Sequence, residues 1–182
     1  MTVLPPPAPE WAVVQWFNTP DPLTLQALRG RAVALLSFQM LCPGCVASAL
    51  PQAARLHALF PRERLAVVGL HTVFEHHEAM TPAALRAFLH EYRIPFPVGV
   101  DRHDGASPLP RTMRAYAMRG TPTWTLIDRE GRLRAQHFGE IDDLHLGAEV
   151  AALTLGADLR APRARGDAPG CADGACAAAA DG

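Results

Sequence analysis

Two cysteines lie between a strand pattern and a helix pattern, and this arrangement constrains the chain most strongly. They belong to the segment Cys42-Pro43-Gly44-Cys45, which follows a continuous apolar run at residues 31–38 that predicts a buried strand. After the pair, apolar residues recur at the spacing of one helix face: Val46, Ala49, Leu50, Ala53, Leu56, Leu59 and Phe60. A thiol at the start of a helix gains acidity from unpaired backbone N–H groups and the helix dipole. The pair therefore predicts dithiol–disulfide chemistry.

Composition narrows the class of protein. The chain has 182 residues, which is enough for one domain with a full core. A net charge of −1 gives no electrostatic reason to expect nucleic acid or an anionic membrane as a partner. No apolar run approaches the roughly 18 residues that cross a bilayer. Residues 1–7 have neither a basic start nor an apolar stretch, so we predict no signal peptide and expect a cytoplasmic protein.

The chain divides into three parts. Residues 1–10 are rich in proline and are expected to be extended or disordered. Residues 11–156 carry the patterns of a folded domain. Residues 157–182 are mostly small residues that cannot bury enough surface to offset their ordering entropy, so this tail is predicted to be disordered. The tail also contains Cys171 and Cys176, which could be an accessory dithiol, metal ligands or incidental cysteines.

The folded part alternates between strand and helix patterns. The expected strands cover residues 11–17, 31–38, 65–70, 96–100, 123–127 and 133–138, the last two forming a hairpin. The expected helices cover residues 23–29, the stretch from the cysteines to near residue 61, a segment opened by Thr81-Pro82, residues 111–118 and residues 144–155. The helix after Thr81 would bury Leu85, Phe88, Leu89 and Tyr92. This order predicts an α/β domain with helices on both faces of a central sheet.

A second motif, Gly120-Thr121-Pro122-Thr123, stands just before a predicted strand. With the cysteine motif and ordered matches at residues 67–70, 96–98 and 126–131, it resembles the thioredoxin superfamily. The resemblance is to the TlpA/ResA-like thiol-disulfide oxidoreductases of the redoxin group, over about residues 11–155. It implies a thioredoxin-like fold: a central mixed β-sheet flanked by helices, with an N-terminal strand extension and an inserted helix–strand unit.

The resemblance also implies roles for individual residues. Cys42 would exchange disulfides with the substrate, and Cys45 would resolve the mixed disulfide. A cis peptide bond would precede Pro122, and the backbone of Thr121 would pair with an extended substrate peptide. Leu41, Pro43 and Gly44 would complete the active-site loop. The implied partners are protein thiols or disulfides and an upstream redox donor, with no cofactor.

The sequence departs from the family pattern near the cysteines. Leu41 replaces the usual tryptophan, Leu36 replaces the buried aspartate of thioredoxins, and Ser48 replaces the glutamate common in the ResA-like branch. Pro51 falls one residue later than usual. The usual carboxylate that accepts the second thiol's proton is therefore missing, which predicts turnover slower than that of a thioredoxin. One of four side chains could replace it, although nothing in the sequence places them near Cys45: His71, Glu75, His76 or His77.

Two other functions compete with disulfide exchange. A peroxiredoxin-like thiol peroxidase would be expected to carry a Pro-x-x-x-Thr-x-x-Cys pattern, but Leu35 and Gln39 occupy its first two defined positions. A structural zinc site would need Cys42, Cys45, Cys171 and Cys176 together, and their wide separation argues against it.

No metal site is predicted from the histidines. The run Glu75-His76-His77-Glu78 is typical of a solvated loop, and a metal would need further donors at matched geometry. The remaining histidines form no usable pattern: His57, His90, His103, His137 and His145.

Overall fold

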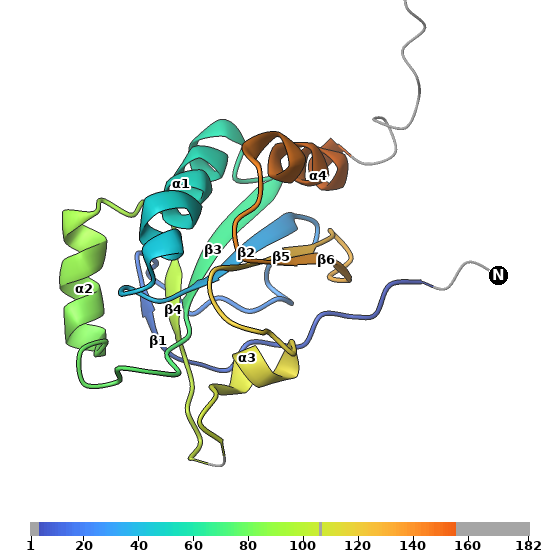
Figure 1. Cartoon of the computed structure of the whole chain (residues 1–182). Helices are drawn as coiled ribbons and strands as arrows, with labels where there is room; N and C mark the ends of the chain where they lie inside the picture. Colours follow the sequence, from blue (N-terminus) through green and yellow to red (C-terminus); the bar gives the residue numbers. More distant parts are fainter. Residues whose placement is uncertain (1–3, 106, 156–182) are drawn as a thin grey trace, which may run out of the picture.

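The computed structural model describes residues 4–105 and 107–155, and within them the chain forms a six-stranded sheet in the order β1-β4-β3-β2-β5-β6 (Figure 1). Strands β2, β3 and β4 are parallel, and β1, β5 and β6 each pair antiparallel with a neighbour. The strands are β1 (Val13–Phe17), β2 (Ala32–Phe38), β3 (Leu65–His71), β4 (Val98–Asp101), β5 (Thr123–Ile127) and β6 (Leu133–Phe138).

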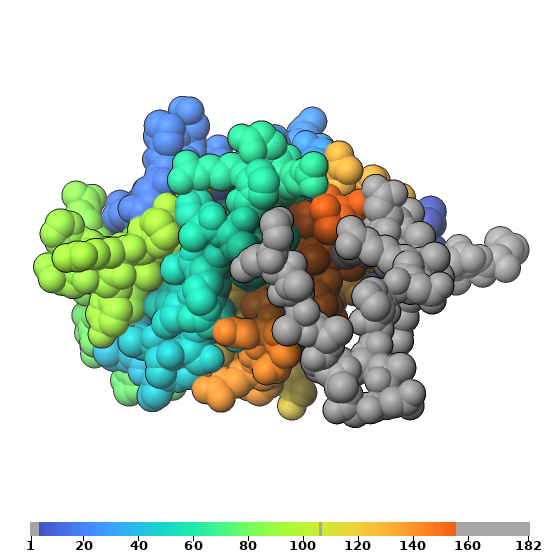
Figure 2. Space-filling view, turned by 90° about the horizontal axis from the view of Figure 1, so that it is seen from above, coloured from blue at the N-terminus to red at the C-terminus, as the bar shows by residue number. Residues whose placement is uncertain are grey.

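Helices cover both faces of the sheet. Leucines of α1, α2 and α4 pack into one hydrophobic core, whereas a methionine of α3 packs into a second core on the opposite face. Figure 2 looks onto the first face and shows α1 and α4 side by side. The helical elements are a single π-helical turn η1 (Cys45–Ala49), α1 (Leu50–Leu59), α2 (Pro82–Glu91), α3 (Arg111–Ala115) and α4 (Asp143–Leu155).

Strand β2 is the centre of the structure and sets the position of the cysteines. All seven of its residues are buried, because successive side chains point to opposite faces of the sheet and each face is covered. Ala34 and Leu36 enter the core under α1, and Val33 and Leu35 enter the core on the opposite face. The strand is held on both sides by β3 and β5. The segment with the cysteines therefore begins at the end of a strand that is fixed on both sides.

The predicted fold class is confirmed: the sheet is mixed, β1 adds an N-terminal strand at its edge, and α2 with β4 forms the inserted helix–strand unit. The hairpin strands β5 and β6 have the predicted bounds. Helix α2 begins after Thr81, whose side chain accepts a hydrogen bond from the N–H of Ala84 at 3.2 Å.

Three local predictions are wrong. Helix α3 ends at Ala115 and not at residue 118. Residues 25–30 form a series of turns instead of a helix. The Leu25 N–H binds the carboxylate of Glu10, and short-range bonds such as Arg31 N–H to Leu28 C=O replace a helical ladder. Tyr92 is 55% exposed because it caps the end of α2, where its ring stacks on Phe88 at the surface. A helical apolar stripe overestimates burial at the last turn.

The proline-rich N-terminus is extended where it is described. The N–H of Ala8 donates to the carbonyl of Gly131, and the N–H of Leu133 donates to the carbonyl of Pro6. This segment thereby covers the start of β6. Within the described residues, no helix has the length and apolar character needed to cross a membrane. The predicted tail, residues 157–182 with Cys171 and Cys176, lies outside the described residues.

Candidate active site

The cysteine pair lies just beyond the carboxyl end of β2, where the chain turns into η1 and α1. Cys42 is half-buried and Cys45 is buried, and both are free thiols. The backbone N–H of Cys45 donates a hydrogen bond of 3.3 Å to Cys42 Sγ. An N–H group at the start of a helix favours negative charge on the sulfur that it contacts. Cys42 is thus the more accessible thiol of the pair, and its sulfur is the one that the helical N–H contacts.

Thr121 and Pro122 face the cysteines from the loop before β5. The peptide bond between them is cis. The Cys42 thiol donates to the Thr121 carbonyl oxygen at 3.5 Å, although the two residues are 79 positions apart in the sequence. A Cβ atom placed on Gly44 would lie 3.6 Å from Pro122 Cδ. The fold thus brings the two sequence motifs into contact.

The buried thiol is a much weaker acid than an ordinary cysteine. The pKa of the Cys45 thiol is raised from 9.0 to about 12, mainly by burial and next by the hydrogen bond with Cys42. The charge of Cys42 also raises this pKa, whereas hydrogen bonds with Gln39 and Thr121 lower it. At neutral pH this thiol is therefore protonated. The contribution of a Cys42 charge disappears when Cys42 is in a mixed disulfide, so the Cys45 proton is easier to remove at that stage.

Gln39 is a site residue that the sequence analysis treated only as a mismatch to the peroxidase pattern. It is 1% exposed and occupies the turn before the cysteines, where its carbonyl accepts a hydrogen bond from the N–H of Cys42 at 3.3 Å. Its side-chain amide reaches Thr121 Oγ1 at 3.5 Å and Glu75 Oε1 at 3.4 Å. Gln39 therefore links the two motifs. Its position three residues before Cys42 gave no sequence signal, because both its burial and its contact with Thr121 depend on the fold.

An exposed apolar side chain lies beside each of the two motifs. Leu41, next to Cys42, is 57% exposed, and Phe138 at the end of β6 is 49% exposed. The Phe138 ring covers Gly120, where a Cβ atom would lie only 2.8 Å from the ring, and the Arg119 guanidinium lies 5.2 Å from the ring centre. This surface can contact an extended apolar segment of a partner.

Comparison with known proteins agrees with this geometry. The model of the AhpC/TSA family matches residues 7–136, which is more than half of the chain. The chain belongs to the AhpC/TSA family. None of the curated proteins shows a significant match to it.

Solved structures extend the AhpC/TSA assignment. A thioredoxin-like superfamily protein has 58% sequence identity and a TM-score of 0.80, with 83% of this chain and 97% of that chain covered. A thiol-disulfide isomerase from Corynebacterium glutamicum has 43% identity and a TM-score of 0.79, with 82% and 97% covered. This AhpC/TSA chain is a thioredoxin-like thiol-disulfide oxidoreductase.

The departures of this AhpC/TSA chain from the usual pattern have a structural basis. Leu36 lies in the apolar core and is fully buried. The N–H of Leu50 bonds to the carbonyl of Cys45, five residues earlier, so η1 holds one residue more than a regular helical turn. This extra residue accounts for the late position of Pro51. As a result Ala49 is buried and Ser48 is only half-buried, and neither carries a carboxylate.

None of the four side chains considered as substitutes for the carboxylate acts directly on Cys45. Burial lowers the pKa of His71 to about 4, and both of its ring nitrogens lack a hydrogen-bond partner among the described residues. Glu75 makes a hydrogen bond with Gln39, which in turn contacts the cysteine segment. His76 and His77 are exposed. The groups that set the pKa of Cys45 are its burial, Cys42, Gln39 and Thr121, and none of them is a carboxylate.

Proposed function

We propose that this chain exchanges disulfides with protein substrates through Cys42 and Cys45. The observation that carries the proposal is the position of Cys42 Sγ, which lies between the helical N–H of Cys45 and the carbonyl of Thr121. The first contact suits a thiolate nucleophile, and the second places the sulfur beside a backbone segment that an extended peptide can pair with.

Reduction of a substrate disulfide would proceed in two exchanges. The Cys42 thiolate attacks one sulfur of the substrate, forming a mixed disulfide and releasing the other substrate sulfur as a thiolate, which takes up a proton. Cys45 then loses its proton and attacks Cys42 Sγ. This step forms the Cys42–Cys45 disulfide and releases the second substrate thiol. Two electrons pass from the protein to the substrate, and the reverse sequence oxidises a dithiol.

Substrate binding would use the exposed side chains of Leu41 and Phe138 together with the Thr121–Pro122 segment. Leu41 beside Cys42 and Phe138 beside Gly120 provide exposed apolar contact surface. A broad specificity for unfolded or extended segments follows from such a surface, because main-chain pairing does not read side chains. The cytoplasm remains our expectation for the location of these exchanges.

The test is the redox midpoint of the pair, measured by equilibrating the full-length protein in graded glutathione buffers, alkylating the thiols and weighing the products. We expect a two-electron transition that survives in the Cys171→Ser/Cys176→Ser variant and is lost in Cys42→Ser. A midpoint near about −270 mV would make the protein a reductant, and one near about −120 mV an oxidant. Absence of the transition would contradict the proposal.

The peroxidase function is distinguished in the same samples. A thiol peroxidase would oxidise Cys42 with hydrogen peroxide at a rate that does not depend on Cys45, because the first product is a sulfenic acid on one sulfur. A disulfide exchanger instead requires both cysteines for turnover of an insulin substrate. In Cys45→Ser, we expect the mixed disulfide with insulin to accumulate. Rapid turnover of peroxide with no reaction toward insulin would favour the peroxidase.

A further inference from the structure

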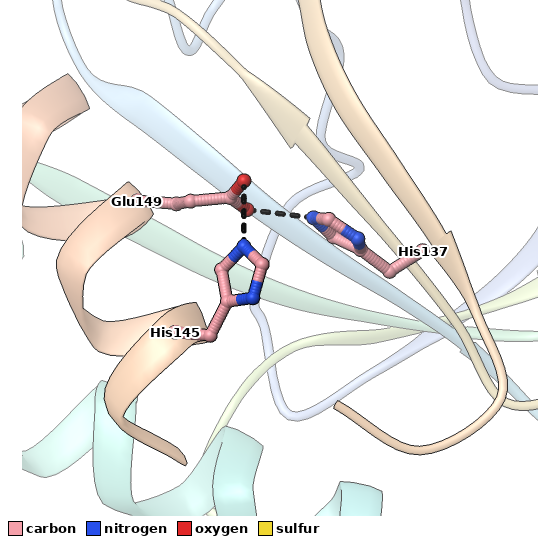
Figure 3. A group of neighbouring side chains, drawn as sticks. All are labelled: His137, His145 and Glu149. Atoms are coloured by element: carbon pink, nitrogen blue, oxygen red, sulfur yellow. Dashed lines mark hydrogen bonds and ion pairs between the residues drawn. The ribbon is translucent and has the colours of Figure 1, made fainter. Parts of the chain in front are cut away.

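Two histidines and a glutamate meet at the junction of β6 and α4. His137 lies on β6, and His145 and Glu149 lie one turn apart on α4 (Figure 3). His137 Nε2 is 2.6 Å from Glu149 Oε2, and His145 Nε2 is 3.3 Å from Glu149 Oε1. Figure 3 shows the two imidazoles approaching the same carboxylate from different directions.

We propose that His137, His145 and Glu149 form a binding site for a divalent transition-metal ion of the Zn²⁺ class. The three ligand atoms lie within 4.8 Å of one another. A zinc ion bound to imidazole nitrogen and carboxylate oxygen at about 2.0–2.2 Å places its donors about 3.3 Å apart. Small side-chain rotations therefore bring all three donors to bonding distance of one ion.

The chemistry of the donors selects the ion. Two imidazole nitrogens with one carboxylate suit Zn²⁺, Ni²⁺ or Cu²⁺, whereas Mg²⁺ and Ca²⁺ prefer sets made of oxygen alone. Binding would replace the hydrogen bonds between the rings and the carboxylate, so that each imidazole carries its proton on Nδ1 and offers the Nε2 lone pair. His137 on β6 and His145 on α4 both contact the carboxylate of Glu149. The fold therefore holds the three ligands together before an ion binds.

The surroundings leave room for an ion and one external ligand. The side chains of His137 and Glu149 are 26% and 30% exposed, and that of His145 is 59% exposed, so two donors are partly shielded and the third lies at the surface. A hollow of about 470 Å³ lies beside them, lined by His137, His145, Gln136 and Glu140 among others. Three protein ligands leave a fourth position, which would open toward this hollow and take water or a small ligand.

The ion would hold β6 to α4 next to the thiol site. The connection between the two elements contacts that site directly, since the Gly139 N–H donates to the Pro122 carbonyl at 2.8 Å. The same connection is tied to α1, where Gln52 Nε2 donates to the Ile141 carbonyl at 2.7 Å. A metal bridge here would therefore fix the segment that supports Pro122.

The test is calorimetric titration of full-length protein with Zn²⁺ and with Mg²⁺. Thiolates also bind zinc, so the four cysteines are first replaced (Cys42→Ser, Cys45→Ala, Cys171→Ser and Cys176→Ser), and circular dichroism verifies folding. We expect one equivalent of Zn²⁺ and no Mg²⁺ to bind. His145→Gln should weaken Zn²⁺ binding by more than about 100-fold, which exceeds the loss from removing an outer partner of a ligand. The matched control is His90→Gln, an exposed helical histidine elsewhere, and it should leave binding unchanged.

A second measurement keeps the cysteines in place. Co²⁺ added to the reduced wild-type chain should give a spectrum of nitrogen and oxygen ligation, without the charge-transfer band of a thiolate ligand, and His137→Gln should abolish that spectrum. Absence of saturable Zn²⁺ binding, or Zn²⁺ binding of equal affinity in His145→Gln and its parent, overturns the proposal. So does a cobalt spectrum carried entirely by thiolate.

Discussion

Histidines at the ends of two strands have opposite environments. His71 ends β3, is 1% exposed and lies against Phe38 with a ring separation of 5.4 Å, and neither ring nitrogen has a hydrogen-bond partner among the described residues. His137 near the end of β6 is partly exposed and shares a carboxylate with His145. Whether a histidine can serve as a ligand therefore depends on the groups that surround it. The first is a neutral core residue, and the second belongs to a site.

The largest change that we predict is in the free energy of unfolding, and it comes from the buried histidine, His71. Burial lowers the pKa of His71 from 6.5 to about 4, so the folded state favours its neutral form. Stability that is fully present above pH 6.5 is therefore lost as the pH falls toward 4. One pKa unit corresponds to about 1.4 kcal/mol, so the free energy of unfolding should fall by about 3 kcal/mol through this group.

His71→Leu isolates that contribution, because all other groups titrate in both proteins. Urea unfolding at a series of pH values should show the variant losing about 3 kcal/mol less than the wild type between pH 6.5 and 4. At pH 7 the variant should be at least as stable, since leucine leaves no polar atom unpaired in the core. If the free energies of unfolding of the two proteins fell equally with pH, the prediction would be wrong, because His71 would then bind a proton equally well in the folded and unfolded states.

The next prediction concerns the hydrogen bonds that join α1 to the segment around Ile141 and Asp143. Gln52 on α1 is 5% exposed and donates 2.7 Å hydrogen bonds to the Ile141 carbonyl and to Asp143 Oδ1. Gln52→Ala leaves the carbonyl without its donor and should lower the free energy of unfolding by about 2 kcal/mol. Hydrogen exchange should become faster at residues 139–143. Unchanged exchange there would show that β6 and α4 hold the connection without help from α1.

The smallest change that we predict is for Arg55, which serves as a control on the same helix, α1. Arg55 also binds Asp143, at 2.9 Å, but the two side chains are 58% and 60% exposed. Gln52 and Arg55 both lower the pKa of the Asp143 carboxyl, with Gln52 the larger cause. Because solvent and salt screen an exposed ion pair, Arg55→Ala should shift the melting temperature far less than Gln52→Ala, and the shift should shrink in high salt. Equal shifts would contradict this ranking.

The sequence predicted best what is encoded within a few neighbouring residues. The bounds of β5 and β6 and the cap at Thr81 follow from alternation and capping chemistry. The cysteine pair was visible for the same reason, since its strand, turn and helix are contiguous. The turns at residues 25–30 were not predicted, because the Leu25 N–H is satisfied by Glu10 in a distant part of the chain.

Long-range geometry accounts for the parts of the sites that were missed. The contact of Gln39 with Thr121 joins segments 82 positions apart, and no local pattern encodes it. His145 and Glu149 have the i, i+4 spacing of one helix face, which was an available signal. His137 gave no such signal, because its approach to Glu149 depends on how α4 packs beside the hairpin. Pairing of this kind becomes visible only in the folded chain.

The wide turn η1 also affects how such chains are compared. It absorbs one additional residue beside the reactive pair, while Leu50, Ala53 and Leu56 of α1 still enter the core. Counting positions from Cys42 without allowing a gap therefore matches Ser48 to a core-facing position that Ala49 occupies. An ungapped motif search would displace each position beyond it by one residue, about 100° around the helix, and a gap placed inside the turn restores the correspondence.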